Sequence, residues 1–208
     1  MKMKKLLAVV LTGVMAVSML TGCADIKTRQ IADQLEGMLK SVNTKATVST
    51  TSDAEDLAKK AAKAVKADDV TFDATKAIEE AGAEGTTPAK KTVDEAIGEA
   101  LKLDETKDKY VWVMYIATKN VKNVDQANKI FSQVKDTTKA KNVAKVENIK
   151  VTTKKDDKTE TKTYQPKAGN HYELGTETFT IGTGKEKTDY VMVIVTCKAV
   201  ADTTKVVE

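Results

Sequence analysis

The residue types that most often carry out catalysis are scarce in this chain. His171 is its only histidine, and Cys197 is one of two cysteines. A catalytic pair of these two residues requires a thiolate of low pKa in contact with solvent. Cys197 instead ends the apolar run 193–197, which is typical of a strand interior, where cysteine behaves as a small hydrophobic residue. We therefore predict a buried, inert thiol and no catalytic pair.

A serine nucleophile would also need His171 as its base. None of the serines beyond residue 22 lies in the Gly-x-Ser-x-Gly pattern of a nucleophile elbow. These serines are Ser41, Ser49, Ser52 and Ser132. No Ser-His-acid triad is predicted.

The acidic residues near His171 do not form a recognised type of metal site. His171 and Glu173 are two positions apart, so on a strand their side chains share one face, and Glu177 follows. Zinc sites use three or four protein ligands, typically with more than one histidine or cysteine. The acidic pairs at 68–69 and 156–157 lack the Asp-x-Asp-x-Asp-Gly spacing of a calcium loop. We expect no metal and no other cofactor.

Aromatic side chains offer a different chemistry, that of a binding surface. Those in the strongly apolar runs are expected in the core. Tyr164 and Tyr172 instead flank the polar segment 165–170, which we predict to be a loop. Loops on a rigid scaffold often carry function. We therefore take Tyr164, Tyr172 and His171 as candidate binding residues.

The first 23 residues combine a basic start, an apolar core and a cysteine. Three lysines precede an apolar stretch from Leu6 to Met19, and Leu20-Thr21-Gly22-Cys23 follows. This arrangement resembles a bacterial lipoprotein signal peptide with its lipobox. The resemblance implies that Cys23 receives a diacylglyceryl group as a thioether and that a signal peptidase cuts before it. The apolar core is shorter than the roughly 20 residues that span a bilayer.

The same resemblance implies an address outside the cytoplasm. Acyl chains such as palmitate on Cys23 would hold the protein on the outer face of the bacterial cytoplasmic membrane, because two or three chains anchor stably where one binds marginally. Ala24, rather than aspartate, after the lipidated cysteine would permit delivery to the outer membrane of a diderm. The membrane is thus one expected partner.

The charge pattern argues against nucleic acid as a partner. Removal of residues 1–22 takes away three lysines and no acid, so the formal net charge falls from +4 to +1. Basic and acidic residues are interspersed, as in 104–109, and Arg29 is the only arginine. Nucleic-acid binding calls for a one-sided basic surface.

Residues 23–105 are predicted to form a helical segment. Ile31, Leu35 and Leu39 recur with the period of an amphipathic helix. Two capping-box patterns, Ser52-Asp53-Ala54-Glu55 and Thr92-Val93-Asp94-Glu95, indicate helix starts. The predicted helices cover 26–42, 52–66, 73–81 and 93–102, and a Gly/Thr/Pro-rich loop covers 82–89.

Residues 106–208 are predicted to form a sheet with one packed helix. The runs 110–116 and 190–195 are β-branched and aromatic, with apolar residues at both parities, which indicates strands covered on both faces. We therefore predict two central strands. The other elements expected are a hairpin of strands over 146–153 and 160–164, a helix starting at Asn123, and a turn over 182–188.

The strand around Gly175 requires an irregularity if it is to bury a single apolar face. Tyr172 and Leu174 have one parity, whereas Phe179 and Ile181 have the other. A one-residue β-bulge near Gly175 would place all four on the same face.

These elements predict an α+β protein with N-terminal helices and a mostly antiparallel sheet of about five strands with one packed helix. The segments 23–105 and 106–208 are expected to share one core, because strands apolar on both faces need cover on both.

The address and the lack of a catalytic constellation favour a non-enzymatic, lipid-anchored protein that binds an envelope partner or serves the envelope structurally. A small cell-envelope hydrolase is the alternative, and it calls for a pocket that gathers His171 with two or more carboxylates. A binding protein calls for an apolar patch rimmed by polar residues. A transporter-associated binding lipoprotein is a third reading, which the length of the chain disfavours.

Overall fold

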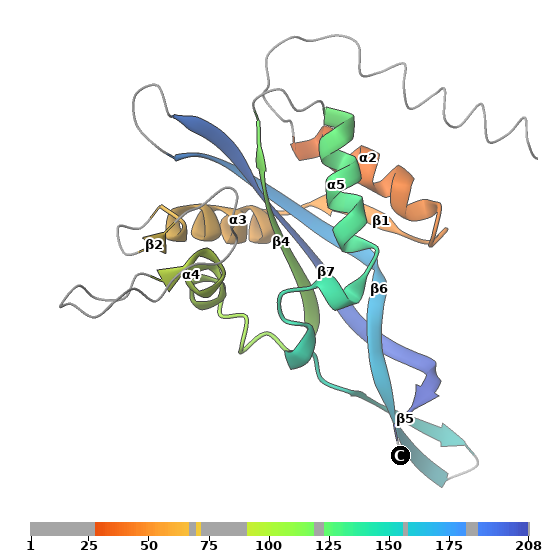
Figure 1. The fold of residues 1–208 in the computed structure, drawn as a ribbon. Coiled ribbons are helices and arrows are strands. Elements are labelled where there is room, and N and C mark those ends of the chain that lie inside the picture. Colours follow the sequence, from red (N-terminus) through yellow and green to blue (C-terminus); the bar gives the residue numbers. More distant parts are fainter. Residues whose placement is uncertain are drawn as a thin grey trace, which may run out of the picture.

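The computed structural model describes residues 28–66, 70–71, 91–118, 123–155, 158–181 and 187–207. It contains helices α2 to α5 and a mixed five-stranded sheet, so the predicted α+β class is confirmed (Figure 1). The signal segment, the predicted helix at 73–81, the loop at 82–89 and most of the turn at 182–188 lie outside the described residues. No described helix has the length and apolar character needed to cross a membrane.

The sheet has the strand order β1-β6-β7-β4, and β5 pairs with the first part of β6. The short edge strand β1 runs parallel to β6, and the other pairs are antiparallel, which agrees with a mostly antiparallel sheet. The strands are β1 (Thr47–Thr50), β4 (Lys109–Ala117), β5 (Ile149–Lys155), β6 (Lys158–Ile181) and β7 (Thr188–Val206). A separate two-stranded sheet joins β2 (Val70–Thr71) to β3 (Lys91–Thr92) in parallel.

Strand β7 lies inside the sheet and is buried on both faces, as its doubly apolar sequence predicts. Successive side chains of a strand point to opposite faces. Val191, Val193 and Val195 therefore enter one apolar cluster, and Met192 and Ile194 enter the other. Cys197 is also buried, at 1% exposure, as predicted.

Helices α2 (Thr28–Lys40) and α5 (Asn123–Val134) cover one face of the sheet (Figure 1). The predicted stripe of Ile31, Leu35 and Leu39 is buried in this layer, as are Ile130 and Val134 of α5. The two helices thus bury their apolar stripes against the same side of β7 and β4.

Helices α3 (Ser52–Ala64) and α4 (Val93–Ala100) cover the opposite face. The predicted capping box of α4 is confirmed, because Thr92 and Glu95 exchange hydrogen bonds with each other's backbone N–H groups. The predicted cap of α3 is wrong by one residue. Thr51 has the extended backbone of an N-cap and accepts from the Ala54 N–H at 3.2 Å, whereas Ser52 is already helical.

The predicted bulge near Gly175 is wrong. Pairing between β6 and β7 runs without interruption from Tyr172 to Ile181. Leu174 therefore packs under α2 and α5 while Phe179 packs under α3 and α4. The change of parity reflects a strand buried on both faces. Glycine at 175 has a different reason, because a Cβ there would overlap the backbone of Ala54 in α3.

Two further predictions about strands need correction. The predicted central position of 110–116 is wrong, since β4 is an edge strand whose outer side meets the chain after α5. The predicted loop at 165–170 is also wrong, because it belongs to β6, with register shifts between Tyr164 and Pro166 and between Ala168 and Tyr172. The polar composition of residues 165–170 therefore reflects an exposed and irregular part of strand β6, which continues through this segment.

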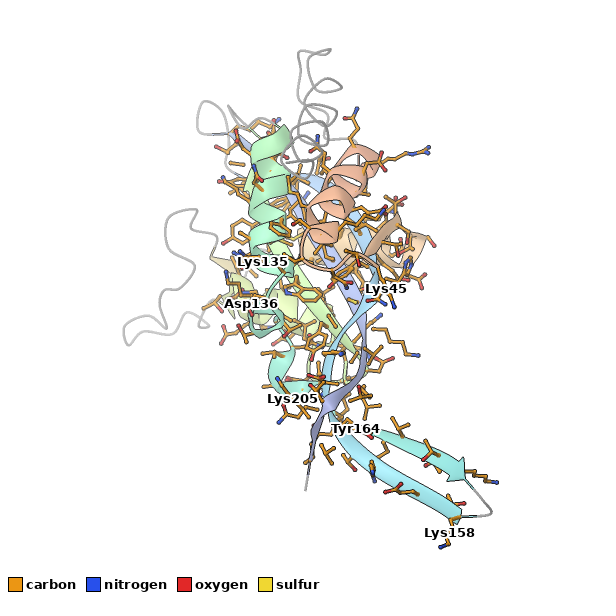
Figure 2. The ribbon with its side chains drawn as sticks, turned by 90° about the vertical axis from the view of Figure 1, so that its right-hand side faces the viewer. Lys45, Lys135, Asp136, Lys158, Tyr164 and Lys205 are labelled. Atoms are coloured by element: carbon orange, nitrogen blue, oxygen red, sulfur yellow. The ribbon has the colours of Figure 1, made fainter. Side chains whose placement is uncertain are left out.

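The predicted hairpin is confirmed as β5 with the start of β6. It projects from the helix-covered body as a two-stranded arm, with Tyr164 at its base and Lys158 at its tip (Figure 2). Lys158 to Lys162 are exposed on this arm. The arm carries Thr and Lys side chains and contributes little to the core.

Candidate binding groove beside strand β4

Along strand β4, residues alternate between those whose backbone groups form hydrogen bonds to β7 and those whose backbone groups face away from β7. The Thr118 N–H donates to the Asp189 carbonyl at 2.9 Å and the Ala199 N–H to the Asp108 carbonyl at 2.8 Å, so even-numbered residues bond to β7. Odd-numbered residues consequently direct their N–H and C=O groups to the outer edge.

Asn142 and Lys141 close the first part of this edge. The Val111 N–H donates to Asn142 Oδ1 at 2.9 Å, and the Lys141 N–H donates to the Val111 carbonyl at 2.8 Å. Asn142 is buried, and its Nδ2 donates to the carbonyls of Thr106 and Lys109, each at 2.8 Å. All the polar atoms of this amide are therefore used to hold the chain after α5 against β4.

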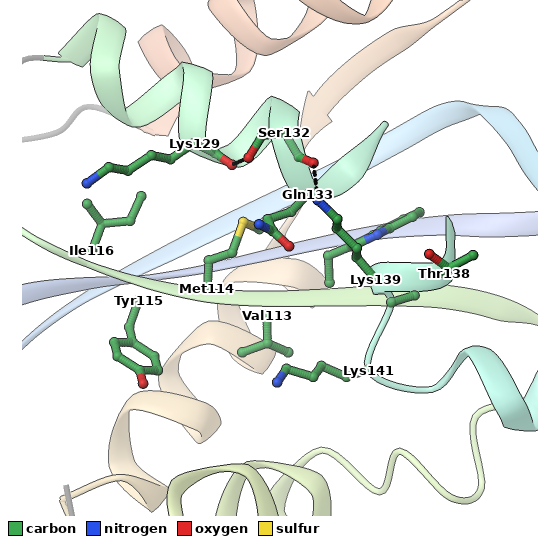
Figure 3. A pocket seen from close by; sticks show the side chains of 12 residues that line it. Val113, Met114, Tyr115, Ile116, Lys129, Ser132, Gln133, Thr138, Lys139 and Lys141 are labelled. Carbon is green, nitrogen blue, oxygen red and sulfur yellow. Dashed lines mark hydrogen bonds between the residues drawn. The ribbon is translucent and has the colours of Figure 1, made fainter. Parts of the chain in front are cut away.

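Beyond Val111 the edge opens into a groove with a cavity volume of about 640 Å³ (Figure 3). Strand β4 forms one side, helix α5 overhangs it, and the segment after α5 forms one end. The lining residues are Trp112, Val113, Met114, Tyr115, Ile116, Lys129, Ser132, Gln133, Thr138, Lys139, Ala140 and Lys141.

The apolar side chains of β4 that line the groove lie on both faces of the sheet. Met114 and Ile116 point toward α5, and Val113 and Tyr115 point to the opposite side (Figure 3). Trp112 is 1% exposed, and its Nε1 donates to the Asp136 carbonyl at 3.1 Å. This buried, hydrogen-bonded indole gives the groove a fixed wall.

The charged side chains that line the groove are all basic. Lys141 forms an ion pair with Asp94 at 2.7 Å, and Lys139 Nζ donates to the Ser132 carbonyl at 3.1 Å. Lys129 is exposed and has no ion-pair partner among the described residues. The described lining of the groove includes no carboxylate, histidine or cysteine. The groove is therefore suited to binding an anionic ligand.

The candidate binding residues taken from the sequence lie elsewhere. Tyr172 is wrong as a surface residue, because it is 5% exposed and its ring lies 6.1 Å from that of Trp112. Its burial raises the pKa of the phenol to about 12. Tyr164 is half-buried at the base of the arm, and His171 is exposed next to β1. The structure does not bring these three residues together in the groove.

The imidazole of His171 lies between two hydroxyl groups of β1. Thr47 Oγ1 lies 2.9 Å from Nδ1, and Ser49 Oγ lies 3.1 Å from Nε2. The Ser49 distance suits a nucleophile and its base, but a hydroxyl occupies the position at which a carboxylate orients the histidine of a triad. Glu173 instead accepts from Thr196 Oγ1 at 3.0 Å. No cluster of three or more potential metal ligands occurs in the described part of the chain.

Sequence reasoning missed the groove because it treated β4 as an internal strand. A signal was present in the polar stretch 135–145, where lysines and threonines follow α5 directly. Nothing in that stretch shows that Asn142 reaches the edge of β4. Comparisons with protein-family models, curated proteins and solved structures found no match to this chain.

Proposed function

We propose that this protein is a bacterial lipoprotein, anchored by lipid on Cys23 to the outer face of the cytoplasmic membrane, that binds a ligand in the groove beside β4 without transforming it. The anchor rests on the resemblance of Leu20-Thr21-Gly22-Cys23 to a lipobox. The binding role rests on one observation, namely an open groove on an edge strand whose charged lining residues are all lysines.

The anchor is tested by metabolic labelling with palmitate and by mass spectrometry of the mature N-terminus. We expect label on the wild-type protein in the membrane fraction and none on Cys23→Ala, because the thiol is the site of acylation. An unmodified Cys23, or cleavage at another bond, contradicts the anchor. Retention in the outer membrane of a diderm would change the address and leave the anchor in place.

The binding role is tested in intact cells with a photo-crosslinking residue in place of Gln133, which lines the groove. The matched control carries the same residue in place of Lys60, which is exposed on α3 on the other side of the sheet. We expect light-dependent adducts at position 133 that excess purified protein suppresses, and none at position 60. Equal adducts at both positions, or none at either, contradict a binding groove.

One observation supports a hydrolase as the second candidate function. Ser49 Oγ lies within hydrogen-bonding distance of His171 Nε2. The pair is less well supported than the groove, because Thr47 and no carboxylate faces the other imidazole nitrogen.

A further inference from the structure

The outer edge of β4 has the features of a template for an additional strand. Val113 is the first residue beyond the part closed by Asn142 whose backbone N–H and C=O groups face the outer edge, and it lines the groove. Its outward N–H and C=O groups have no hydrogen-bonding partner in the part of the chain that the structure describes. Such exposed edge groups readily pair with an extended segment of another molecule.

Asn142 and Lys141 already reproduce part of this pairing. The Asn142 side chain accepts from the Val111 N–H, and the Lys141 N–H donates to the Val111 carbonyl. These are the two hydrogen bonds that one residue of a neighbouring antiparallel strand would make. The protein therefore supplies a short substitute for a strand at Val111 and stops where the groove begins.

We infer that the ligand of the groove is an extended peptide segment with acidic side chains, which binds beside β4 as an added strand that pairs with the outward N–H and C=O groups of Val113. This inference rests on the proposed binding function. The groove follows β4 from Trp112 to Ile116, a length of about 17 Å that an extended segment of about five residues spans, so a hexapeptide covers it fully.

Charge complementarity selects the acidic character of the segment. Side chains of an added strand alternate between the two faces of the sheet. Lys129 and Lys139 lie on the α5 side of β4, and Lys141 lies on the other side, where it meets Asp94 of α4 (Figure 3). Carboxylates at alternate positions of the peptide therefore meet Lys129 and Lys139, while the intervening apolar side chains meet Val113 and Tyr115.

Lysines beside an edge strand also have a simpler role, because charge near an edge prevents aggregation. That role requires neither a peptide partner nor a particular peptide charge. If the lysines only prevent aggregation, the Val113 amide stays open to solvent whether or not a peptide is present. Hydrogen exchange of this amide therefore distinguishes the two roles.

The experiment uses the full chain in detergent and a blocked, fluorescent hexapeptide of alternating valine and glutamate. We expect saturable binding, measured by anisotropy, that weakens with salt and is at least about tenfold tighter than binding of the valine–glutamine peptide. The bound peptide should slow hydrogen exchange of the Val113 amide, because that N–H becomes a donor to the added strand.

The charge dependence is tested with Lys129→Glu combined with Lys139→Glu. The matched control, Lys60→Glu combined with Lys63→Glu, makes the same change in net charge on exposed positions of α3. We expect the groove variant to lose at least about tenfold in affinity and the control to stay close to wild type. Equal losses of affinity in the groove variant and the control variant would show that only the net charge of the protein matters, which would overturn the inference.

Three other outcomes overturn it. Binding without protection of the Val113 amide shows a contact that is only electrostatic. A concentration-dependent dimer with a protected Val113 amide in the absence of peptide shows that a second copy occupies the edge. Failure of the peptide to bind, when position 133 still gives crosslinks in cells, removes the peptide inference alone. Failure of both experiments removes the binding function as well.

Discussion

Asn142 Oδ1 accepts a hydrogen bond from the backbone N–H of Val111, and this contact marks where the closed part of the β4 edge ends. The same buried amide donates to two carbonyls on the chain leading into β4. Together with the Lys141 N–H, which donates to the Val111 carbonyl, this side chain attaches the segment after α5 to the sheet, and the groove begins beyond these contacts.

Replacement of Asn142 with alanine should lower the free energy of unfolding by about 2–4 kcal/mol. Three hydrogen bonds are lost, each with a net value of about 1 kcal/mol, and buried backbone groups lose their partners. Chemical denaturation measures the change. Asn128→Ala, at an exposed position of α5, is the matched control and should stay within about 0.5 kcal/mol of wild type. Equal effects would show that the Asn142 contacts contribute no stability.

The close approach of α3 to β6 gives a second prediction. A methyl group at Gly175 would overlap the backbone of Ala54 and Glu55, which a helix cannot relieve by a side-chain rotation. Gly175→Ala should therefore destabilise the protein by more than about 1–3 kcal/mol, the usual range for overpacking. Gly98→Ala in α4 is the control, because a Cβ there meets nothing within 4 Å.

The control substitution should stabilise by about 0.5–1 kcal/mol, since alanine loses less backbone entropy than glycine in a helix. The midpoint temperature of thermal unfolding should thus decrease for Gly175→Ala and increase for Gly98→Ala, relative to wild type. A neutral Gly175→Ala would contradict the tight packing of α3 on β6.

The amphipathic and doubly apolar patterns made much of the fold predictable. The stripe of Ile31, Leu35 and Leu39 and the capping box at Thr92 are local signals, and both helices form where these signals lie. Strand β7 was also identifiable, because a run that is apolar at both parities needs cover on both faces.

The neighbours of each strand were not predictable, because they depend on contacts distant in sequence. The doubly apolar run of β4 suggested an internal strand, but apolar parity reports cover above and below a strand and says nothing of its edges. Likewise, the parity change between Leu174 and Phe179 has two explanations, a bulge or burial on both faces, and only the position of α3 decides between them. The groove follows from the edge position of β4 and was missed with it.

The buried thiol and phenol predict a loss of stability in alkali. Burial raises the pKa of Cys197 from 9.0 to about 12 and that of Tyr172 from 10.0 to about 12. Because the folded state holds these protons more tightly, their contribution is complete below pH 9 and is lost as the pH rises toward 12. Denaturation at pH 8 and pH 11 should show the decrease, and Cys197→Ala should reduce its size.

The same thiol should resist alkylation at pH 8 in the folded protein and react after denaturation, since it is both protonated and buried. Rapid modification of the native protein would contradict this environment.

A fluorophosphonate probe for activated serines should leave Ser49 unlabelled. Among the described residues, Thr47 Oγ1 and no carboxylate lies at Nδ1 of His171, the position from which a carboxylate stabilises the imidazolium of a triad. Mass spectrometry after treatment of the wild type and of Ser49→Ala checks the result. Labelling that disappears in the variant would favour the hydrolase over the binding protein.

The last prediction concerns the relation between the two halves of the chain. Helices α3 and α4 cover Met192, Ile194 and Phe179, and α2 covers the opposite face, so a fragment of residues 106–208 would expose apolar side chains on both faces. We expect this fragment to be aggregated or molten, whereas the intact chain unfolds in one cooperative step. Circular dichroism and calorimetry of the two proteins measure the difference.

Limited proteolysis gives an independent check on the same prediction. The Gly/Thr/Pro-rich segment 82–89 is expected to be cut early, because such composition is typical of an accessible loop. If the halves share one core, the two products should remain associated through gel filtration and separate only in denaturant. Release of a C-terminal product that is stable and unfolds cooperatively by itself would instead show that the sheet needs no cover from α2, α3 and α4.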